Sequence, residues 1–358
     1  MRQKPVAHTR PISSAPSSAS PGRFRRMLAV VTVLVLIGGA LLFRLLQERA
    51  NPPALAMSEL ERRAREQPND LQAQLDWGSA LQKTGQLEAA GQVFEQAAKL
   101  APQDEQVYLW QGIVAVQRRQ SEKAISCFLL SLRYHPNDPD VWHALAKEYA
   151  RTHDLNHALD AYEHVVQLRP SDAVAWREVG ALDMQRQRYA RGRKALLRAT
   201  QLNPVDMQAQ TLLGTLDTIV GQLPEAKQAF DRVLTHDPNN AQALAGMAKV
   251  ALQLDPSPAG LQRAEQQVRQ ALALQPSGEA HLTLGRIHLL RREYAPAIDA
   301  LKGALSADPR LTSAYVFLSQ AYAASGRPDL ARSATRDYQA AQARGSTPKS
   351  GAGGGGDR

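Results

Sequence analysis

The sequence predicts an all-α protein, a right-handed α-solenoid of about eight helix-turn-helix repeats preceded by one transmembrane helix. Three observations lead to this fold class. Prolines recur at a fixed period, small and bulky residues keep the same phase between those prolines, and one uncharged apolar run stands near the N-terminus. A fixed period of about 20–50 residues is typical of stacked repeats rather than of a domain with one compact core.

Eight prolines mark the repeat. Six of them are each 34 residues apart, and the last two follow after 38 and 33 residues: Pro68, Pro102, Pro136, Pro170, Pro204, Pro238, Pro276 and Pro309. With the proline placed at position 32, the repeats begin at Leu71, Glu105, Pro139, Ala173, Met207, Ala241, Gly278 and Thr312. Proline cannot continue a helix, so it is expected to end the second helix of each repeat. Asp138 and Asp172, which follow two of these prolines, are expected to cap the next helix.

Two positions of the repeat hold small residues and a third holds a bulky one. Position 8 carries Gly78, Gly112, Ala146, Gly180, Gly214, Ala248, Gly285 and Ser319. Position 20 carries Ala90, Ala124, Ala158, Gly192, Ala226, Ala264, Ala297 and Ala331, where the sixth repeat is counted without its four inserted residues. Position 24, counted in the same way, is bulky in all but the last repeat and carries Phe94, Phe128, Tyr162, Leu196, Phe230, Val268, Leu301 and then Thr335. This pattern predicts two antiparallel helices, A and B, that approach closely at the small residues while the bulky residue fills the remaining space. Glycines near position 15, namely Gly85, Gly221 and Gly326, are expected to take the left-handed turn between them.

These residues resemble the tetratricopeptide repeat (TPR) family over residues 71–342. One departure is a four-residue insertion around Asp255–Pro258 in the sixth repeat, which is expected to lengthen the loop between its helices. Residues 47–70 are interpreted as a linker and a capping helix, Glu59–Gln67, and the last helix, Asp329–Gln342, as the opposite cap, because terminal repeats need a polar outer face. Residues 343–358 form a Gly-rich tail that is expected to be flexible.

The resemblance implies a concave groove lined mainly by positions 2, 5, 9, 12 and 13 of helix A. Its residues here are apolar in the first two repeats, basic in the middle and mixed afterwards. The candidate peptide-groove residues are Leu75, Leu109, Ile113, Val116, His143, Lys147, Arg151, Arg177, Lys249, Leu252, Leu282, Arg286 and Leu289, with Ile219 and Leu290 at position 13 of later repeats. Such a groove suits a protein or peptide partner that is amphipathic or acidic. The chaperone-tail subclass of the family uses asparagines that are absent here, since Ser79 and Ile113 stand at position 9, so that function is not inferred.

The N-terminal segment predicts a membrane anchor. Residues 1–26 form a basic tail, rich in Pro and Ser and expected to be disordered, that carries six Lys and Arg and no acid. Residues 27–46 form a run of 20 residues interrupted only by Arg44, which as a helix spans about 30 Å and matches a bilayer core. The positive-inside rule places the N-terminus in the cytoplasm and the repeats on the far side, the periplasm if the protein is bacterial, as its Ala-, Gln- and Arg-rich repeats suggest.

Other interpretations of the N-terminal segment stay open. Ala54-Leu55-Ala56 has the form of a signal-peptidase site, which would make the protein a cleaved, secreted one, although the site lies ten residues beyond Leu46. A mitochondrial presequence would also be Arg- and Ser-rich and poor in acids, but the long single apolar block fits it less well. A buried helix of the repeat domain is a further alternative, which the flanking arginines disfavour.

Composition and motifs argue against nucleic-acid binding and catalysis. The net charge is +9, yet residues 50–343 are net neutral, so the predicted folded part lacks the basic footprint of a nucleic-acid-binding surface. The single cysteine, Cys127, excludes an internal disulfide and is interpreted as a small buried residue, with an intermolecular disulfide as the alternative. No phosphate loop, nucleophile elbow or metalloprotease motif occurs.

The remaining polar candidates also favour a protein that is not an enzyme and holds no cofactor. His281 and His288, like His157 and His164, are seven residues apart, which on a helix is about 10.5 Å and too far to share one metal ion. Asp183 and Asp217 occupy position 11 in adjacent repeats, where the family commonly has Tyr, so they are expected to lie near each other. Arg186, Arg188 or Lys194 is expected to satisfy them.

The sequence thus predicts a membrane-tethered TPR scaffold that binds a protein or peptide partner in its groove. Its layout resembles bacterial inner-membrane proteins with a periplasmic TPR domain, which by analogy suggests envelope protein assembly, secretion or cytochrome maturation. The alternatives are a cleaved secreted TPR protein and an organelle import receptor with cytosol-facing repeats. An enzyme fused to the repeats is disfavoured, because only the Gly-rich tail follows them. Self-association is left open.

Overall fold

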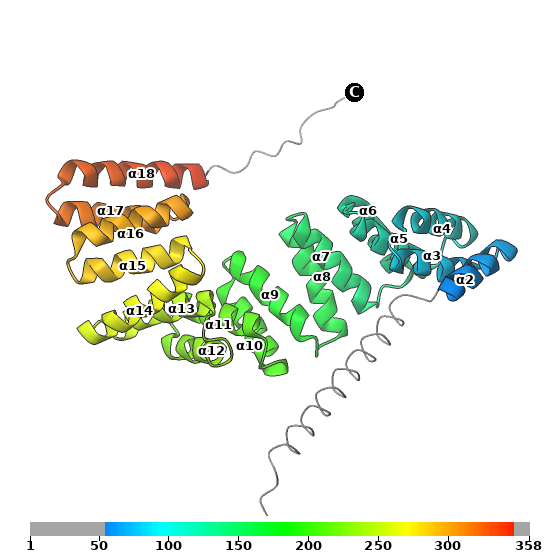
Figure 1. Cartoon of the computed structure of the whole chain (residues 1–358), viewed down its shortest axis with the longest axis horizontal. Coiled ribbons are helices and arrows are strands. Elements are labelled where there is room, and N and C mark those ends of the chain that lie inside the picture. The colour runs from blue at the N-terminus through cyan, green and yellow to red at the C-terminus, as the bar shows by residue number, and fades with distance from the viewer. Residues whose placement is uncertain (1–53, 347–358) are drawn as a thin grey trace, which may run out of the picture. The chain divides into compact units, whose positions relative to one another are not determined.

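The computed structural model describes residues 54–346, and every element in that part of the chain is an α-helix, from α2 to α18 (Figure 1). The chain divides after Tyr134 into two compact blocks, which are described separately: an N-terminal block with α2–α6 and a C-terminal block with α7–α18. The predicted basic tail and the predicted transmembrane helix at residues 27–46 lie outside the described residues. Among the helices of residues 54–346, none is long and apolar enough to cross a bilayer.

Within each block, every repeat is a pair of helices that packs on the next pair. In the N-terminal block the helices are α2 (Ala54–Glu66), α3 (Leu71–Lys83), α4 (Leu87–Leu100), α5 (Glu105–Gln117) and α6 (Ser121–Tyr134). In the C-terminal block they are α7 (Pro139–Arg151), α8 (Leu155–Leu168), α9 (Ala173–Gln185), α10 (Tyr189–Leu202), α11 (Met207–Ile219), α12 (Leu223–His236), α13 (Ala241–Leu254), α14 (Pro258–Leu274), α15 (Gly278–Leu290), α16 (Tyr294–Ala307), α17 (Thr312–Ala324) and α18 (Pro328–Ser346). Every helix A therefore begins at the residue that starts a sequence repeat.

The repeat boundaries are set by the proline and by a capping side chain. Helix B ends two residues before the repeat proline, as in α6, which ends at Tyr134 before Pro136. Two residues after that proline, the Asp138 carboxylate accepts hydrogen bonds from the backbone N–H groups of Asp140 (2.9 Å) and Val141 (3.2 Å) at the start of α7. Asp172 caps α9 in the same way, so both predicted caps are confirmed.

Close approach of helix A and helix B depends on the small residue at position 8. A Cβ atom built on Gly112 would lie 2.5 Å from Cε1 of Phe128, and one on Gly214 would lie 2.9 Å from Cε1 of Phe230. Phe128 and Phe230 are fully buried. The bulky residue at position 24 therefore occupies the space that a side chain at position 8 would need, as the sequence predicts.

The turn between helix A and helix B takes a left-handed residue in seven repeats. Gly85, Gly221 and Gly326 have φ values of 80°, 81° and 74°, which confirms their predicted role. At the same position four repeats place a residue with a side chain at φ between 58° and 61°: Arg119, His153, Gln187 and Arg292. This conformation costs about 1–2 kcal/mol for a residue with a Cβ atom, so the packing of the two helices must hold it in place.

The sixth repeat differs from the expectation. Its inter-helix loop, residues 255–257, is three residues long, like the loop at residues 84–86 between α3 and α4, so the prediction of a longer loop was wrong. The extra residues extend the helices instead: α13 has 14 residues and α14 has 17. The reason is local, because Ser257 accepts a hydrogen bond from the Gly260 backbone N–H (3.1 Å) and Pro258 stands in the first turn, so a helix can start early.

Position 4 of helix A connects successive repeats through a recurring hydrogen bond. Its side chain donates to the backbone carbonyl of the repeat proline six residues earlier. The donors are Tyr108 Oη (2.8 Å to Pro102), Trp142 Nε1 (2.7 Å to Pro136), Trp176 Nε1 (3.0 Å to Pro170) and Gln210 Nε2 (3.2 Å to Pro204). The aromatic residues seen at this position in the sequence thus satisfy a carbonyl that the helix end leaves without a partner.

The two terminal helices of the described region differ from the repeats between them. Helix α2 packs against α3, and the Gln74 side chain donates to the Ala64 carbonyl (2.9 Å). Helix α18 runs to Ser346, four residues beyond its predicted end. Its outward residues Asp329, Arg332 and Arg336 are exposed, which agrees with the expected polar outer face of a terminal helix.

The contact at position 8 gives a direct prediction. We expect Gly112→Ala to lower the free energy of unfolding by about 1–2 kcal/mol, because overpacking against Phe128 outweighs the gain of about 1 kcal/mol in helix propensity. The matched control is Gly91→Ala on α4, where the added Cβ would meet nothing closer than 3.5 Å; this change should stabilise by up to about 1 kcal/mol. Urea denaturation followed by circular dichroism measures both. Gly112→Ala as stable as the parent chain would contradict the packing argument.

Candidate functional site

We define the helix A face as the side chains at positions 2, 5, 9, 12 and 13 of helix A. In the N-terminal block, Leu109, Ile113 and Val116 are half-buried on this face. Leu75 is not on it: this side chain is only 4% exposed and belongs to a core cluster with Phe94 and Val107, so its assignment as a groove residue was wrong. Val107 comes from helix A of the next repeat, so stacking of the two repeats covers Leu75.

Leu252 and Leu282 were also wrongly assigned to the groove, because both side chains are buried. They are 4% and 6% exposed. Leu252 shares a core cluster with Leu284 of α15, and Leu282 shares one with Leu318 of α17. In each case the next repeat's helix A contributes to the cluster that buries the leucine. Apolar residues at these positions therefore stabilise the stack rather than line a groove.

The predicted basic centre of the groove consists of His143, Lys147, Arg151 and Arg177. Carboxylates of the chain neutralise its two arginines. Arg177 forms ion pairs with Asp206 and Glu178, both at 2.8 Å, and its side chain is only 16% exposed. Burial alone would lower the pKa of Arg177, but the hydrogen bonds to Glu178 and Asp206 outweigh it and raise that pKa. Arg151 pairs with Glu148 at 2.9 Å. Arg177 and Arg151 thus have carboxylate partners that the sequence pattern did not reveal.

The other two residues of the centre behave differently. Lys147 is exposed and forms no ion pair within the described residues. The His143 ring is half-buried and lies edge-on to Tyr162, with 5.5 Å between ring centroids. Asp140, an acid at position 2 of the same helix, pairs with Arg169 at 2.9 Å, which lowers the pKa of this carboxyl. Lys147 is therefore the cation of this centre that is open to a partner.

A hollow of about 430 Å³ lies on the helix A face at the C-terminal end of the C-terminal block. It brings together the predicted residues Arg286 and Leu289 with residues that the prediction did not include. Its lining is Arg286, Leu289, Leu290, Arg292, Tyr294, Phe317, Gln320 and Ala324. The Arg286 guanidinium carbon stands 5.2 Å from the centre of the Phe317 ring, a cation–π contact. Lys249, at the same repeat position as Arg286 but one repeat earlier, lies 3.4 Å from Glu279.

Asp183 and Asp217 are buried acids away from this hollow, each with its own arginine partners. Both carboxylates are buried, and burial raises the pKa of each. Asp183 lies 2.8 Å from Arg188, as predicted, and 3.0 Å from Arg191, while Asp217 lies 2.5 Å from Arg193 Nε. Arg191 and Arg193 were not foreseen. Because each carboxylate is paired with arginine, we interpret both acids as members of internal salt bridges.

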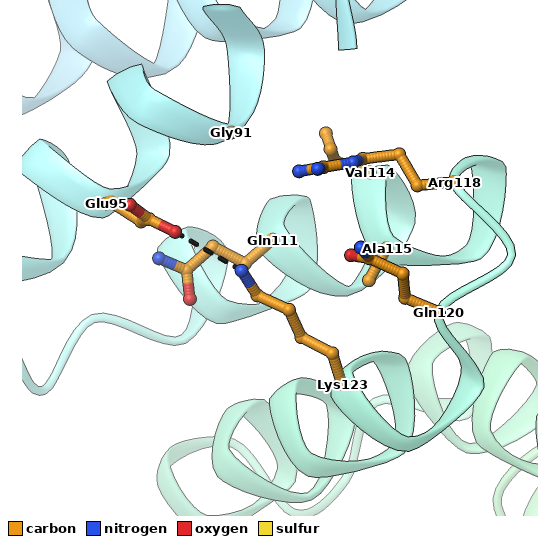
Figure 2. A pocket seen from close by; sticks show the side chains of 8 residues that line it. All are labelled: Gly91, Glu95, Gln111, Val114, Ala115, Arg118, Gln120 and Lys123. Atoms are coloured by element: carbon orange, nitrogen blue, oxygen red, sulfur yellow. Dashed lines mark hydrogen bonds and ion pairs between the residues drawn. The ribbon is translucent and has the colours of Figure 1, made fainter. Parts of the chain in front are cut away.

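A crevice in the N-terminal block is too small for a ligand. It lies between α4, α5 and α6, and its volume of about 10 Å³ is that of a single water site. Figure 2 shows the Lys123 side chain reaching across it to Glu95, at 3.2 Å. Cys127, nearby on α6, is buried, and burial raises the pKa of its thiol, as suits a structural residue.

Three of the four histidines considered as metal ligands have other contacts, and Nδ1 of the fourth, His281, has no hydrogen-bond partner among the described residues. His288 Nδ1 lies 2.5 Å from Glu293 Oε2, His157 Nδ1 lies 2.7 Å from Asp154 Oδ2, and His164 stacks on Trp142. Within residues 54–346 no group of three or more His, Cys, Asp or Glu side chains is arranged to hold a metal ion.

Comparisons with known proteins address the family and the fold. Family models described as tetratricopeptide repeat match residues 81–148, 139–172 and 260–312. One similar structure, from the APC/C hetero-tetramer Cut9–Hcn1, has 16% identity and a TM-score of 0.54, over 77% of this chain and 54% of that chain. Another, the C-terminal part of a TPR repeat-containing protein from Cytophaga hutchinsonii, has 14% identity and a TM-score of 0.51, over 68% of this chain and 99% of that one.

These identities establish the fold alone. The present chain spans only about half (54%) of the length of the Cut9–Hcn1 chain that it matches. A search of curated proteins finds no match.

The ion pairs of the basic centre lead to a second prediction. We expect Arg177→Met to lower the free energy of unfolding by about 2–3 kcal/mol, because it leaves the buried Asp206 carboxylate without its cation. The control is Lys147→Met on the same face, which removes an exposed cation and should change the stability by less than about 0.5 kcal/mol. Equal midpoints of urea denaturation for the two variants would contradict the structural role assigned to Arg177.

Proposed function

We propose that this chain is a membrane-tethered tetratricopeptide repeat adaptor that holds a protein or peptide partner on its helix A face. The TPR fold is generally a non-catalytic scaffold that binds protein partners. We propose that the partner is amphipathic or acidic, and that the process is envelope protein assembly, secretion or cytochrome maturation.

One observation carries the binding proposal. Ile219 and Leu290 occupy position 13 of helix A in the fifth and seventh repeats, and they are 48% and 55% exposed. Single exposed apolar residues are common on protein surfaces, but these two recur at one repeat position, and Leu290 borders the hollow of about 430 Å³. A repeated apolar position beside a hollow is what an extended partner lying across successive helices A would contact.

The tether is supported by the N-terminal sequence. Residues 27–46 have the length and apolar character of a membrane-spanning helix, and the six cations before them favour a cytoplasmic N-terminus. In this arrangement the repeats lie on the far side of the membrane, in the periplasm if the protein is bacterial. A tether would raise the local concentration of the repeats at the membrane and so favour partners that are themselves membrane-bound.

Photocrosslinking in living cells tests the binding proposal. A photoreactive residue placed at Lys147 or Leu290 on the helix A face should give one dominant crosslinked protein. The control site is Gln228 on α12, which is also exposed but belongs to a helix B. Equal, diffuse labelling from all three sites would contradict binding on the helix A face.

Reporter fusions test the tether and its orientation. A phosphatase that is active only outside the cytoplasm, fused after Ser346 at the end of α18, should be active and should stay in the membrane fraction. Activity released into the soluble fraction, with a chain shortened near Ala54, would favour the cleaved secreted form. An inactive phosphatase together with an active cytoplasmic reporter at the same place would reverse the orientation, as an import receptor with cytosol-facing repeats requires.

A further inference from the structure

The hollow between α15 and α17 contains an arginine, Arg286, that has no ion-pair partner among residues 54–346. Within the described residues, Arg286 forms no hydrogen bond and no ion pair, and its polar neighbours across the hollow are Arg292 and Gln320. Its contact is with the Phe317 ring, at 5.2 Å. Burial lowers the pKa of Arg286, with a partial offset from Glu279, which shows that the guanidinium is partly withdrawn from water.

The repeat pattern explains why this cation has no partner. In the preceding repeat the cation at position 9, Lys249, pairs with the acid at position 2 of the following repeat, Glu279. Arg286 stands at position 9 of the seventh repeat, and position 2 of the eighth repeat is Ser313. The acid that the stack supplies to Lys249 is therefore missing for Arg286. No Asp or Glu is among the residues that line the hollow, and Glu279 offsets the charge of Arg286 only in part, without forming an ion pair with it.

We propose that this hollow binds an extended peptide segment in which an Asp or Glu side chain stands beside a large apolar side chain. The carboxylate would occupy the place left by the missing position-2 acid, against Arg286, and the apolar side chain would lie among Leu290, Phe317 and Tyr294. This inference rests on the proposed function. It specifies which part of the helix A face binds the partner and which side chains the partner contributes.

The chemistry of the hollow favours this occupant. An arginine guanidinium offers a planar fork of donors that matches a carboxylate, and the pairing is stronger where water is partly excluded. The leucine and aromatic side chains around it require an apolar group next to the charge. A volume of about 430 Å³ holds a few side chains rather than a folded surface, near the lower end of the range of about 300–1,000 Å³ usual for ligand pockets.

The test is selection from a phage-displayed library of random peptides fused through their C-terminal ends, so that side chains are the only carboxylates they offer. The bait is the full-length chain in detergent. Selected peptides should be enriched in Asp or Glu adjacent to a large apolar residue. Synthetic, C-terminally amidated copies should bind the chain, and copies with Gln or Asn in place of the acid should bind at least tenfold more weakly, as measured by fluorescence anisotropy.

Three variants assign the binding to this hollow. Arg286→Met keeps the apolar stem and should weaken binding at least tenfold. Ser313→Glu restores the acid of the repeat pattern opposite Arg286 and should also weaken binding, without altering Arg286 itself. Lys249→Met, the matched cation one repeat earlier, should bind as the parent chain does. Because Arg286 has no ion-pair partner to lose, its replacement should leave the thermal midpoint unchanged, and Ser313→Glu supplies a second test if Arg286→Met folds poorly.

Several outcomes would overturn the inference. These are peptides selected without acidic residues, equal affinity of the parent chain and of both Arg286→Met and Ser313→Glu, or a selection that yields no binder. If the synthetic peptides bound only with a free C-terminal carboxylate, the inference that a side-chain carboxylate binds Arg286 would also be wrong. None of these results removes the proposed function, because crosslinking from Lys147 or Leu290 would still reveal a partner that binds through another part of the helix A face.

Discussion

The contact between position 8 and position 24 is the constraint on which the rest of this fold depends. Gly112 lies against the Phe128 ring so closely that a single added carbon would clash. In the fourth repeat, glycines occupy both small positions: a Cβ atom on Gly180 would lie 3.1 Å from the Gly192 carbonyl oxygen, so the two helix backbones meet almost directly. Since each repeat packs mainly on its neighbours, this local distance between helix A and helix B fixes where the next pair can dock. The hydrogen bond from position 4 to the repeat proline then connects one pair to the next, as Trp176 does with Pro170.

Much of this arrangement could be predicted from the sequence because it repeats. A small residue that recurs in phase with a bulky one and with a proline identifies helix pairs, their ends and their caps, since each feature has one physical cause wherever it occurs. The features that the sequence did not predict are those that the residue type at a position does not reveal. The turn residues Arg119, His153, Gln187 and Arg292 adopt a conformation that their side chains disfavour, and only the packing of the helices reveals it. The extra residues of the sixth repeat lengthen its helices because Ser257 provides a cap. The spacing of the prolines does not show whether inserted residues extend a loop or a helix.

The candidate site was less predictable, because burial and ion pairing depend on the neighbouring repeat. A groove position read from one repeat does not show that Leu282 shares a core cluster with Leu318 of the following repeat. Nor does it show that the charge of Arg177 is taken up by Asp206, which is 29 residues away. Ion pairs between adjacent repeats recur in the C-terminal block, as Arg191 with Glu163 and Lys249 with Glu279. The net neutrality of residues 50–343 is thus partly built repeat by repeat, through acids that face the cations of an adjacent repeat.

Against this pattern of ion pairs between repeats, Arg286 is an exception among the described residues, because it has no carboxylate partner. A half-buried cation has lost part of its hydration, and a carboxylate from the next repeat normally compensates for the loss. Where the next repeat offers Ser313 in place of an acid, the Arg286 guanidinium lies over the Phe317 ring instead, in a cation–π contact. No carboxylate of residues 54–346 accepts a hydrogen bond from its N–H groups. A carboxylate of a partner would therefore add a favourable interaction that these residues do not supply. In a solenoid whose core contacts are repeated from pair to pair, selectivity for a partner arises at the positions where the pattern is broken. Arg286 occupies such a position on the face that the helices A present to solvent.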